Sequence, residues 1–374
     1  MDFIEDLRYW KFTKNVLHHT IIDFYNPEEA DYGYLANYYP SKICIAYKLY
    51  ATVEHYYQAQ KFTNDAELYE KVRTAPTPAD AKSISRQFPE KVDPAWDSKK
   101  VDAMEVAVLE KFKQNPHLTS MLFQTDTAIL RERIPDDAPT DTFWGWNPMV
   151  GGLNMAGKIL MKVRMEIGGY DIFGICLVKN VPTRNGKQMT YAVSKEMQHM
   201  AIVVPPKDES KLPIVRLHSR CWTGDVFDSV KCDCRSQLWR GMEQIECNEG
   251  GGVLIYLDQE GRGLGIVTKI RGFNSQKHGF DTVQACQIQN AMPDVRDYGE
   301  AAEMLKRLGI LQIRLITNNK AKEEGMAANG IKVVENIRMR VENYNINSQS
   351  RKYFETKVKK LGHHKHLLNG KNES

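Results

Sequence analysis

Three cysteines stand close together in the second half of the chain, where ten residues separate Cys221 from Cys232 and one residue separates Cys232 from Cys234. Three thiolates suit a soft, tetrahedral ion such as Zn²⁺ and leave its fourth position open for water, as a catalytic zinc site requires. The alternative is that all three are small buried residues without a metal. The spacing favours one Zn²⁺ per chain at this cluster.

A glycine-rich segment, DQEGRGLG at residues 258–265, follows the cysteines. The apolar run Val253–Leu257 before it predicts a strand, and Ile266–Gln276 after it predicts a helix. At such a strand-to-helix turn, free backbone N–H groups together with Arg262 can meet a phosphate. Most turns of this kind only reverse the chain. The segment therefore indicates a function only together with the motifs around it.

Six segments stand in order between about residue 170 and Leu368: RLHSRC, CDC, DQEGRGLG, DTVQA, PDVRDYG and LITNNKAK. This ordered set resembles GTP cyclohydrolase II. The resemblance implies zinc-dependent hydrolytic opening of the guanine ring of GTP, with Mg²⁺ on the phosphates. The implied products are 2,5-diamino-6-ribosylamino-4(3H)-pyrimidinone 5′-phosphate, formate and pyrophosphate.

The same resemblance implies roles for individual residues. Asp294 would accept a proton, and Arg296 would act at the α-phosphate, either as the nucleophile or by stabilising transition-state charge. Glu260 would bind the guanine edge, and cationic side chains would bind the triphosphate. The implied GTP-binding set is Arg216, Leu217, His218, Ser219, Gln237, Glu260, Gly261, Arg262, Thr282, Thr317 and Lys322.

Taken without the motif order, these residues have plainer interpretations. Asp294 with Arg296 would indicate an ion pair on the surface. Thr317 with Asn318 would indicate the cap of the next helix.

Three residues depart from the family pattern. Phe273 stands where the family usually has the tyrosine of an IRAY segment. Arg220, beside the zinc ligand Cys221, and Gln284 each stand where the family usually has glutamate. Loss of the tyrosine hydroxyl removes a general acid or a group that orients water. The alternative function is therefore a zinc hydrolase that retains the carbon on a formamidopyrimidine product or takes another nucleotide.

The segment LANYYPSKICIAYKLYATVEHYYQAQKF, residues 35–62, holds a second candidate site. Thr52 is placed to cap a helix on which Glu54, Gln58 and Lys61 form one polar stripe. A polar stripe is usually the solvated face of a helix.

This segment, together with DTFWGWNP and NMAGKILMKVR, resembles the NADAR-type riboflavin-intermediate N-glycosidases over about residues 20–167. The resemblance implies that Glu54 is catalytic, with Trp96 and Asp141 as partners, and that Lys61 and Asn37 line the pocket. A carboxylate suits the oxocarbenium-like state of C1′–N cleavage, and an indole can stack on a pyrimidine.

Residues 146–148, WNP, stand where this family has more glycines, which bears on loop geometry and substrate preference.

The implied substrates are ribosylaminopyrimidine phosphates, which the second half of the chain would produce. A binding or sensing protein for ADP-ribose-like ligands is the alternative from another class.

The pattern of apolar residues changes near Gly169. Before this point the chain has segments of helical period, and after it short β-branched runs predict strands that later alternate with helices. We predict an α+β protein of two domains, mainly helical over 1–168 and mixed α/β over 169–374. The predicted helices of the first domain are Val53–Phe62, Val101–Phe112 and Asn154–Ile167, and the predicted strands of the second include Ile172–Val178, Met189–Val193, Ala201–Val204, Ile214–Leu217, Ile313–Thr317 and Ile331–Val334.

Composition narrows the classes of protein. The chain has 374 residues, is 42% hydrophobic and carries a formal net charge of +4, which gives no electrostatic case for a nucleic-acid partner or a membrane surface. No stretch reaches the roughly 18 apolar residues of a membrane span. Seven cysteines with three clustered favour a reducing compartment, so we expect a cytoplasmic protein. The GTP cyclohydrolase II resemblance implies a homodimer.

Overall fold

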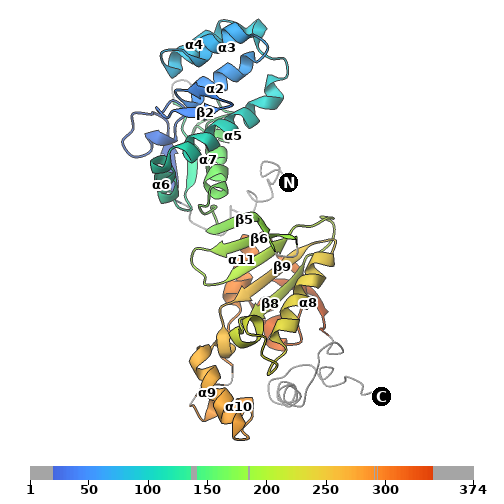
Figure 1. Cartoon of the computed structure of the whole chain (residues 1–374). Helices are drawn as coiled ribbons and strands as arrows, with labels where there is room; N and C mark the ends of the chain where they lie inside the picture. Colours follow the sequence, from blue (N-terminus) through green and yellow to red (C-terminus); the bar gives the residue numbers. More distant parts are fainter. Residues whose placement is uncertain (1–19, 136–140, 184–185, 290, 293, 340–374) are drawn as a thin grey trace. The chain divides into compact units, whose positions relative to one another are not determined.

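The computed structural model describes residues 20–135, 141–183, 186–289, 291–292 and 294–339. The chain forms two compact units, an N-terminal unit, Met1–Cys176, and a C-terminal unit, Leu177–Ser374 (Figure 1). The boundary expected after residue 168 stays a prediction. No helix in the described ranges has the length and apolar character needed to cross a bilayer.

The described part of the N-terminal unit is mainly helical, as expected. Two short strands, β1 and β4, pair in parallel, and β2 and β3 form an antiparallel hairpin. The elements are β1 Ile21–Phe24, β2 Ile43–Ile45, β3 Lys48–Tyr50, α2 Val53–Ala59, α3 Ala66–Arg73, α4 Pro78–Arg86, α5 Trp96–Gln114, α6 Pro116–Gln124, β4 Ile129–Glu132 and α7 Met155–Glu166, with short 3-10 turns at Gly33–Leu35, Gln60–Phe62 and Pro89–Lys91.

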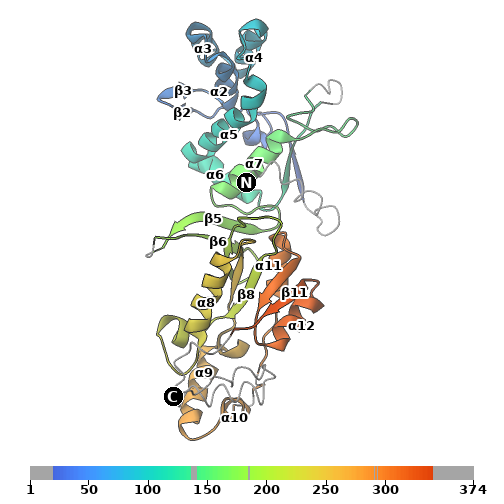
Figure 2. The ribbon, with the colours of Figure 1, turned by 90° about the vertical axis from the view of Figure 1, so that its right-hand side faces the viewer.

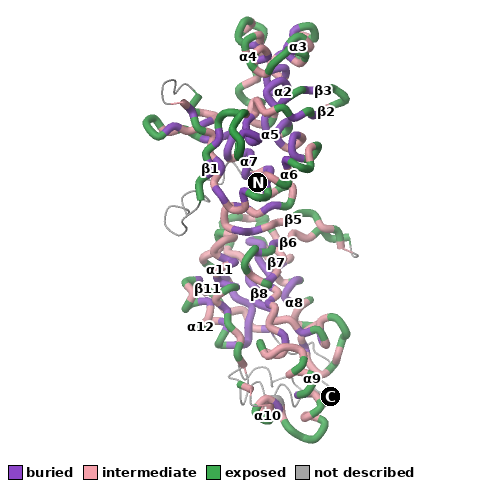
Figure 3. The backbone as a smooth tube through the Cα atoms, turned by 90° about the vertical axis from the view of Figure 1, so that its left-hand side faces the viewer, coloured by how far each residue is buried: buried purple, intermediate pink, exposed green. Residues whose placement is uncertain are grey.

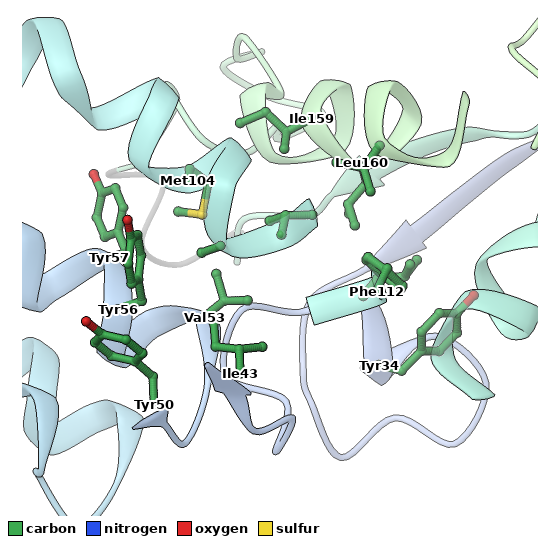
Figure 4. Close-up of a cluster of buried hydrophobic side chains, with 14 of the residues drawn as sticks. Tyr34, Ile43, Tyr50, Val53, Tyr56, Tyr57, Met104, Phe112, Ile159 and Leu160 are labelled. Carbon is green, nitrogen blue, oxygen red and sulfur yellow. The ribbon is translucent and has the colours of Figure 1, made fainter. Parts of the chain in front are cut away.

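A tyrosine-rich core holds these helices together. Figure 4 shows Val53, Tyr56 and Tyr57 of α2 facing Met104 of α5, with α7 across the core. The helix predicted over Asn154–Ile167 is confirmed as α7, and its residues Met155, Ile159 and Val163 are buried. The predicted cap of α2 is also confirmed, because the Thr52 side chain accepts a hydrogen bond from the backbone N–H of His55. These contacts fix the helix that carries Glu54.

A seven-stranded mixed sheet forms the centre of the C-terminal unit, in the order β11-β10-β8-β9-β7-β6-β5. The four strands from β11 to β9 run parallel to their neighbours, and β7 runs antiparallel to β9 and β6. The strands are β5 Ile175–Pro182, β6 Gln188–Ser194, β7 Met200–Val204, β8 Ile214–Ser219, β9 Gly252–Leu257, β10 Gln312–Ile316 and β11 Lys332–Ile337.

Helices cover both faces of this sheet. Helix α8, Cys234–Cys247, lies on one face, and α11, Gly299–Arg307, and α12, Lys320–Ala328, lie on the other (Figure 2). The covered strand β8 is buried along most of its length, including its polar residues Arg216 and His218 (Figure 3). Helices α9, Gly265–Lys277, and α10, Thr282–Gln287, pack against each other at one end of the unit.

The strand predicted over Ile172–Val178 begins later, at Ile175. The cause is Asp171, whose carboxylate accepts hydrogen bonds from the backbone N–H groups of Phe173 and Ile175. These bonds form a turn that competes with extended structure. Helix α8, which begins at Cys234, was not predicted.

Candidate active sites

The carboxyl ends of three parallel strands meet at one edge of the C-terminal sheet. Ser219 ends β8, Leu257 ends β9 and Ile316 ends β10. The segments that follow these strands contribute Cys221, Glu260 and Thr317 to one pocket, as expected for the ligand site of an open parallel sheet. The pocket, including its solvent-open mouth, holds about 1350 Å³ of empty space.

The three predicted metal ligands come together at this edge. Their Sγ atoms all lie within 4.8 Å of one another, and those of Cys221 and Cys232 are 3.6 Å apart. Tetrahedral zinc with bonds of about 2.3 Å needs sulfur atoms roughly 3.8 Å apart, so the cluster fits such an ion. A side chain at Gly224 would have its Cβ 2.9 Å from Cys232 Sγ, which makes glycine necessary for this approach.

Lys269 of α9 is a residue that the sequence analysis missed. Its Nζ lies 3.0 Å from Cys221 Sγ and 2.8 Å from Glu260 Oε1. Hydrogen bonds from Cys232 and Cys234, with added help from Lys269, hold the pKa of the Cys221 thiol far below its usual value. The ammonium group thus favours the thiolate form that binds a metal.

Asp225 is a second missed residue and organises the other side of the thiol cluster. Its carboxylate accepts hydrogen bonds from the backbone N–H of Cys221 at 3.0 Å and from Tyr256 Oη at 2.8 Å. His218 Nε2 lies 3.2 Å from both carboxylate oxygens, and its ring stacks on Tyr256. Burial lowers the pKa of His218, so this pair is a neutral imidazole beside a carboxylate.

Most of the residues expected to bind nucleotide line the same pocket. Leu217 does not, because it is buried within β8, where its carbonyl accepts a hydrogen bond from Lys322 Nζ at 2.8 Å. The side chain of Thr282 lies outside the described residues. The expected residues that line the pocket are Arg216, His218, Ser219, Gln237, Glu260, Gly261, Arg262, Arg296, Thr317 and Lys322.

Asp294 and Arg296 form a close ion pair at the side of this pocket. Arg296 Nε donates to Asp294 Oδ1 at 2.8 Å, and Arg296 Nη1 lies 3.4 Å from Ser219 Oγ. Although burial opposes it, the bonds from Arg296 hold the pKa of Asp294 below its usual value. The aspartate is therefore an ionised acceptor fixed against an arginine that borders the nucleotide pocket.

The glycine-rich turn is held by bonds within the protein. The backbone N–H of Gly261 donates to Glu260 Oε1, and that of Gly263 donates to the carbonyl of Gln259. Gly261 and Arg262 both have positive φ, so the turn is tightly wound. These two N–H groups are therefore not available to a phosphate.

Each departure from the family pattern has a defined place. Arg220 Nη1 lies 2.5 Å from Asp258 Oδ1, so its charge is paired beside the thiols. Gln284 completes the capping box of α10 with Asp281, a role that glutamine fills as well as glutamate. Phe273 lines the pocket, with Lys231 Nζ 4.6 Å from its ring centre.

Glu54 and Gln58 of the N-terminal unit are buried, so the plain alternative of a solvated polar face does not hold for them. The reason is that α3, α4 and α5 pack around α2. Gln58 Nε2 donates to Glu54 Oε1 at 2.7 Å, while Gln58 Oε1 is buried with no hydrogen-bond partner among the described residues. Burial raises the pKa of Glu54.

Aromatic rings border this carboxyl group. Tyr57 packs edge-on against Trp96, with ring centres 5.0 Å apart, and against Trp144 at 5.5 Å. Lys61 Nζ lies 5.6 Å from the Tyr57 ring centre and 6.0 Å from that of Trp96. Asn37 contributes its carbonyl, which accepts a hydrogen bond from the backbone N–H of Glu54.

A further carboxyl group, Glu132 at the end of β4, was not predicted. Burial, with smaller contributions from Asp141 and Glu54, raises the pKa of Glu132 to about 7. Its Oε2 is buried with no hydrogen-bond partner among the described residues. The predicted partner Asp141 is itself exposed but close enough to raise the pKa of Glu54. Glu54, Glu132 and Asp141 are therefore close enough for their charges to affect one another.

Comparison with known proteins agrees with both sites. Residues 23–168 match the NADAR domain, and residues 176–338 match GTP cyclohydrolase II. Over 91% of its length the chain is 38% identical to a riboflavin biosynthesis protein of Vibrio vulnificus, of which it covers 92%. The chain belongs to this riboflavin biosynthesis family. Both resemblances drawn from the motifs are confirmed, and with these two domains the chain is a hydrolase that includes an N-glycosidase domain.

Other relatives share part of the chain. The riboflavin biosynthesis protein RibBA of Chlorobium phaeovibrioides is 41% identical over 49% of this chain and 45% of that protein. RibBA of Bacillus subtilis is 39% identical over 50% of this chain and 47% of its own length. The solution structure of the Escherichia coli protein YbiA is 33% identical and covers 41% of this chain and 87% of that one, with a TM-score of 0.36.

The buried carboxyl of Glu132 predicts a pH-dependent stability of the family's NADAR domain. Its folded pKa of about 7 exceeds the ordinary value of 4.5, so the folded state holds a proton that the unfolded state loses between these values. Stability should therefore fall as pH rises through this window. Glu132→Gln should stabilise the domain more at pH 8 than at pH 5, by on the order of 1–3 kcal/mol. Thermal unfolding at both pH values measures the difference, and an equal effect at both would contradict it.

Proposed function

We propose that the C-terminal unit opens the guanine ring of GTP by hydrolysis and releases formate and pyrophosphate. The observation that supports this most directly is the thiol cluster of Cys221, Cys232 and Cys234 at the wall of a cation-lined pocket. One Zn²⁺ held by these thiols would, when bound, supply Lewis acidity for hydrolysis at C8. Free thiols in such a site suit a reducing compartment such as the cytoplasm.

The other residues of the pocket would bind the phosphates and the guanine, stabilise charge and accept a proton. Arg216, Arg262 and Lys322 are placed to bind the triphosphate, with Mg²⁺ neutralising part of its charge. Arg296 would stabilise charge at the α-phosphate, and Asp294, kept ionised, would accept a proton. Both oxygens of Glu260 already accept bonds, from Lys269, Gly261 and the backbone of Trp222, so its contact with guanine would use their remaining lone pairs.

The metal and the product test this proposal together. Purified protein should hold about one zinc ion per chain and convert GTP and Mg²⁺ to formate and pyrophosphate. Cys232→Ser should lose both zinc and activity, whereas Cys247→Ser, which changes an exposed thiol, should retain both. Lys269→Met should lower metal affinity or activity about 10- to 100-fold. Zinc-loaded protein that leaves GTP unchanged would reject the proposal.

We propose further that the N-terminal unit hydrolyses the N-glycosidic bond of ribosylaminopyrimidine phosphates. Glu54, buried beside the Tyr57–Trp96 pair, supports this role. A carboxylate there would stabilise an oxocarbenium-like state or activate water, while the rings hold the base. Asp141 would assist by raising the pKa of Glu54.

Replacing the buried carboxyl group tests this second activity. Glu54→Gln keeps the shape of the side chain but removes its charge, so release of ribose 5-phosphate should fall about 100- to 10,000-fold. Glu67→Gln, at an exposed position on α3, is the control. Opening of GTP by the same preparation should be unaffected. A Glu54→Gln protein that cleaves at the full rate would exclude the mechanism.

Phe273 favours a second candidate for the C-terminal reaction. Its ring lines the pocket and offers no hydroxyl group to assist departure of the carbon. Under this candidate the product is a formamidopyrimidine that keeps the formyl group. Mass spectrometry of the GTP product distinguishes the two: retained formyl in the wild type and formate release by Phe273→Tyr support it. Free formate from the wild type excludes it.

A further inference from the structure

Three cations of the N-terminal unit lie on the side of Glu54 formed by α4. Lys82 and Arg86 are one turn apart on α4, so they share a helix face. Helix α4 packs against α2, which carries Glu54 and leads into the turn that carries Lys61. Lys61 was expected to line the pocket by resemblance to the family. No role was expected for Lys82 or Arg86.

The packing of α4 on α2 brings these cations near the buried carboxyl, and electrostatic effects agree with this. Although burial raises the pKa of Glu54, Lys82 and Lys61 both act to lower it. Burial lowers the pKa of Lys61, attraction by Glu54 raises it, and repulsion by Lys82 and Arg86 lowers it. Tyr38 completes the group, with Lys82 Nζ 5.9 Å from its ring centre. Charges perturb one another in this way only over short distances.

The described residues place no carboxylate in a direct ion pair with these cations, although Glu54 attracts Lys61 from nearby. Among the residues that the structure describes, none of Lys61, Lys82 and Arg86 has a carboxylate within ion-pair distance, whereas nearby Lys48, Lys91 and Lys99 each have one. Cations that repel one another beside a buried site are costly to hold together. An anionic ligand would remove that cost.

Aromatic rings suited to a base lie close to these cations. Lys61 Nζ lies over the rings of Tyr57 and Trp96. Gln58 Oε1, buried next to Glu54 without a partner among the described residues, offers a further hydrogen-bond acceptor. The site therefore combines aromatic rings, a carboxyl group and cations, which suit a base, a glycosidic carbon and a phosphate.

We propose that Lys82 and Arg86, together with Lys61, bind the 5′-phosphate of the glycosidase substrate. The site would then take ribosylamine 5′-phosphates in preference to the dephosphorylated nucleosides. This inference rests on the proposed N-glycosidase function. The same chemistry would accept the diphosphate of an ADP-ribose-like ligand, and the experiment separates the two.

Substrate pairs test the preference for phosphate. The full-length chain would be given the ribosylaminopyrimidine 5′-phosphate and the same compound after phosphatase treatment, and kcat/KM would be measured for each. The ratio of the two values should favour the phosphate and should fall at least about tenfold in Lys82→Gln and in Arg86→Gln, mainly through KM. Lys71→Gln, at an exposed position on α3, should keep the wild-type ratio. A ratio unchanged by Lys82→Gln and Arg86→Gln would overturn the proposal.

Binding of the product tests the subsite without catalysis. Calorimetry with ribose 5-phosphate, ribose and ADP-ribose would compare the wild type with the Lys82→Gln/Arg86→Gln double variant. We expect ribose 5-phosphate to bind and to lose at least about tenfold in affinity in the double variant, with ribose bound weakly by both. The C-terminal pocket is unchanged in both proteins and would bind these ligands equally. The difference in affinity between the wild type and the double variant therefore reports the N-terminal site.

Failure of the phosphate subsite can be distinguished from failure of the proposed N-glycosidase function. Equal ribose 5-phosphate binding by the wild type and the double variant would overturn the phosphate subsite even if the glycosidase is active. Loss of binding in the double variant by a chain that cleaves neither substrate would support the subsite and reject the glycosidase function. Stronger binding of ADP-ribose than of ribose 5-phosphate would overturn the assignment to a monoester.

Discussion

The parallel pairing of β8 with β9 on one side and β10 on the other is the constraint on which the nucleotide site depends. Arg216 lies opposite Leu254 and Ile316, and Ser219 lies opposite Leu257. Because parallel strands end at the same edge, the segments after them must converge there, although about 100 residues separate β8 from β10. A slip of one residue in either pairing would turn these side chains to the opposite face.

Around this edge, buried carboxylates keep the thiols and cations in place. Asp225 accepts bonds from the backbone of Cys221 and from Tyr256, and Glu260 accepts bonds from the backbone of Trp222 and from Lys269. An ionised carboxylate tolerates burial only when its lone pairs are satisfied, and here two of the donors, the backbone N–H groups of Cys221 and Trp222, belong to the segment that carries the proposed metal ligands. The same hydrogen bonds therefore offset the cost of burying Asp225 and Glu260 and orient the site before any ligand binds.

The sequence predicted what depends on local pattern. The cap at Thr52, the helix α7 and most strands of the C-terminal sheet follow from residue type and spacing. Whether the polar stripe of α2 is solvated or buried could not be predicted, because α4 and α5 cover α2 and periodicity in one helix does not reveal what packs on it. Lys269 and Glu132 were missed because their partners come from distant segments, which only the fold brings together.

The charges of the two sites fit the chemistry that would connect them. Opening GTP with loss of pyrophosphate leaves a phosphate monoester, which carries about −1.5 to −2 charges at neutral pH. Lys61, Lys82 and Arg86 beside Glu54 hold a net positive charge of similar size when that carboxyl is ionised. A triphosphate would leave excess negative charge beside two further carboxyl groups, Glu132 and Asp141. Under the two proposals, the N-terminal site would therefore suit the nucleotide left after loss of pyrophosphate better than GTP itself.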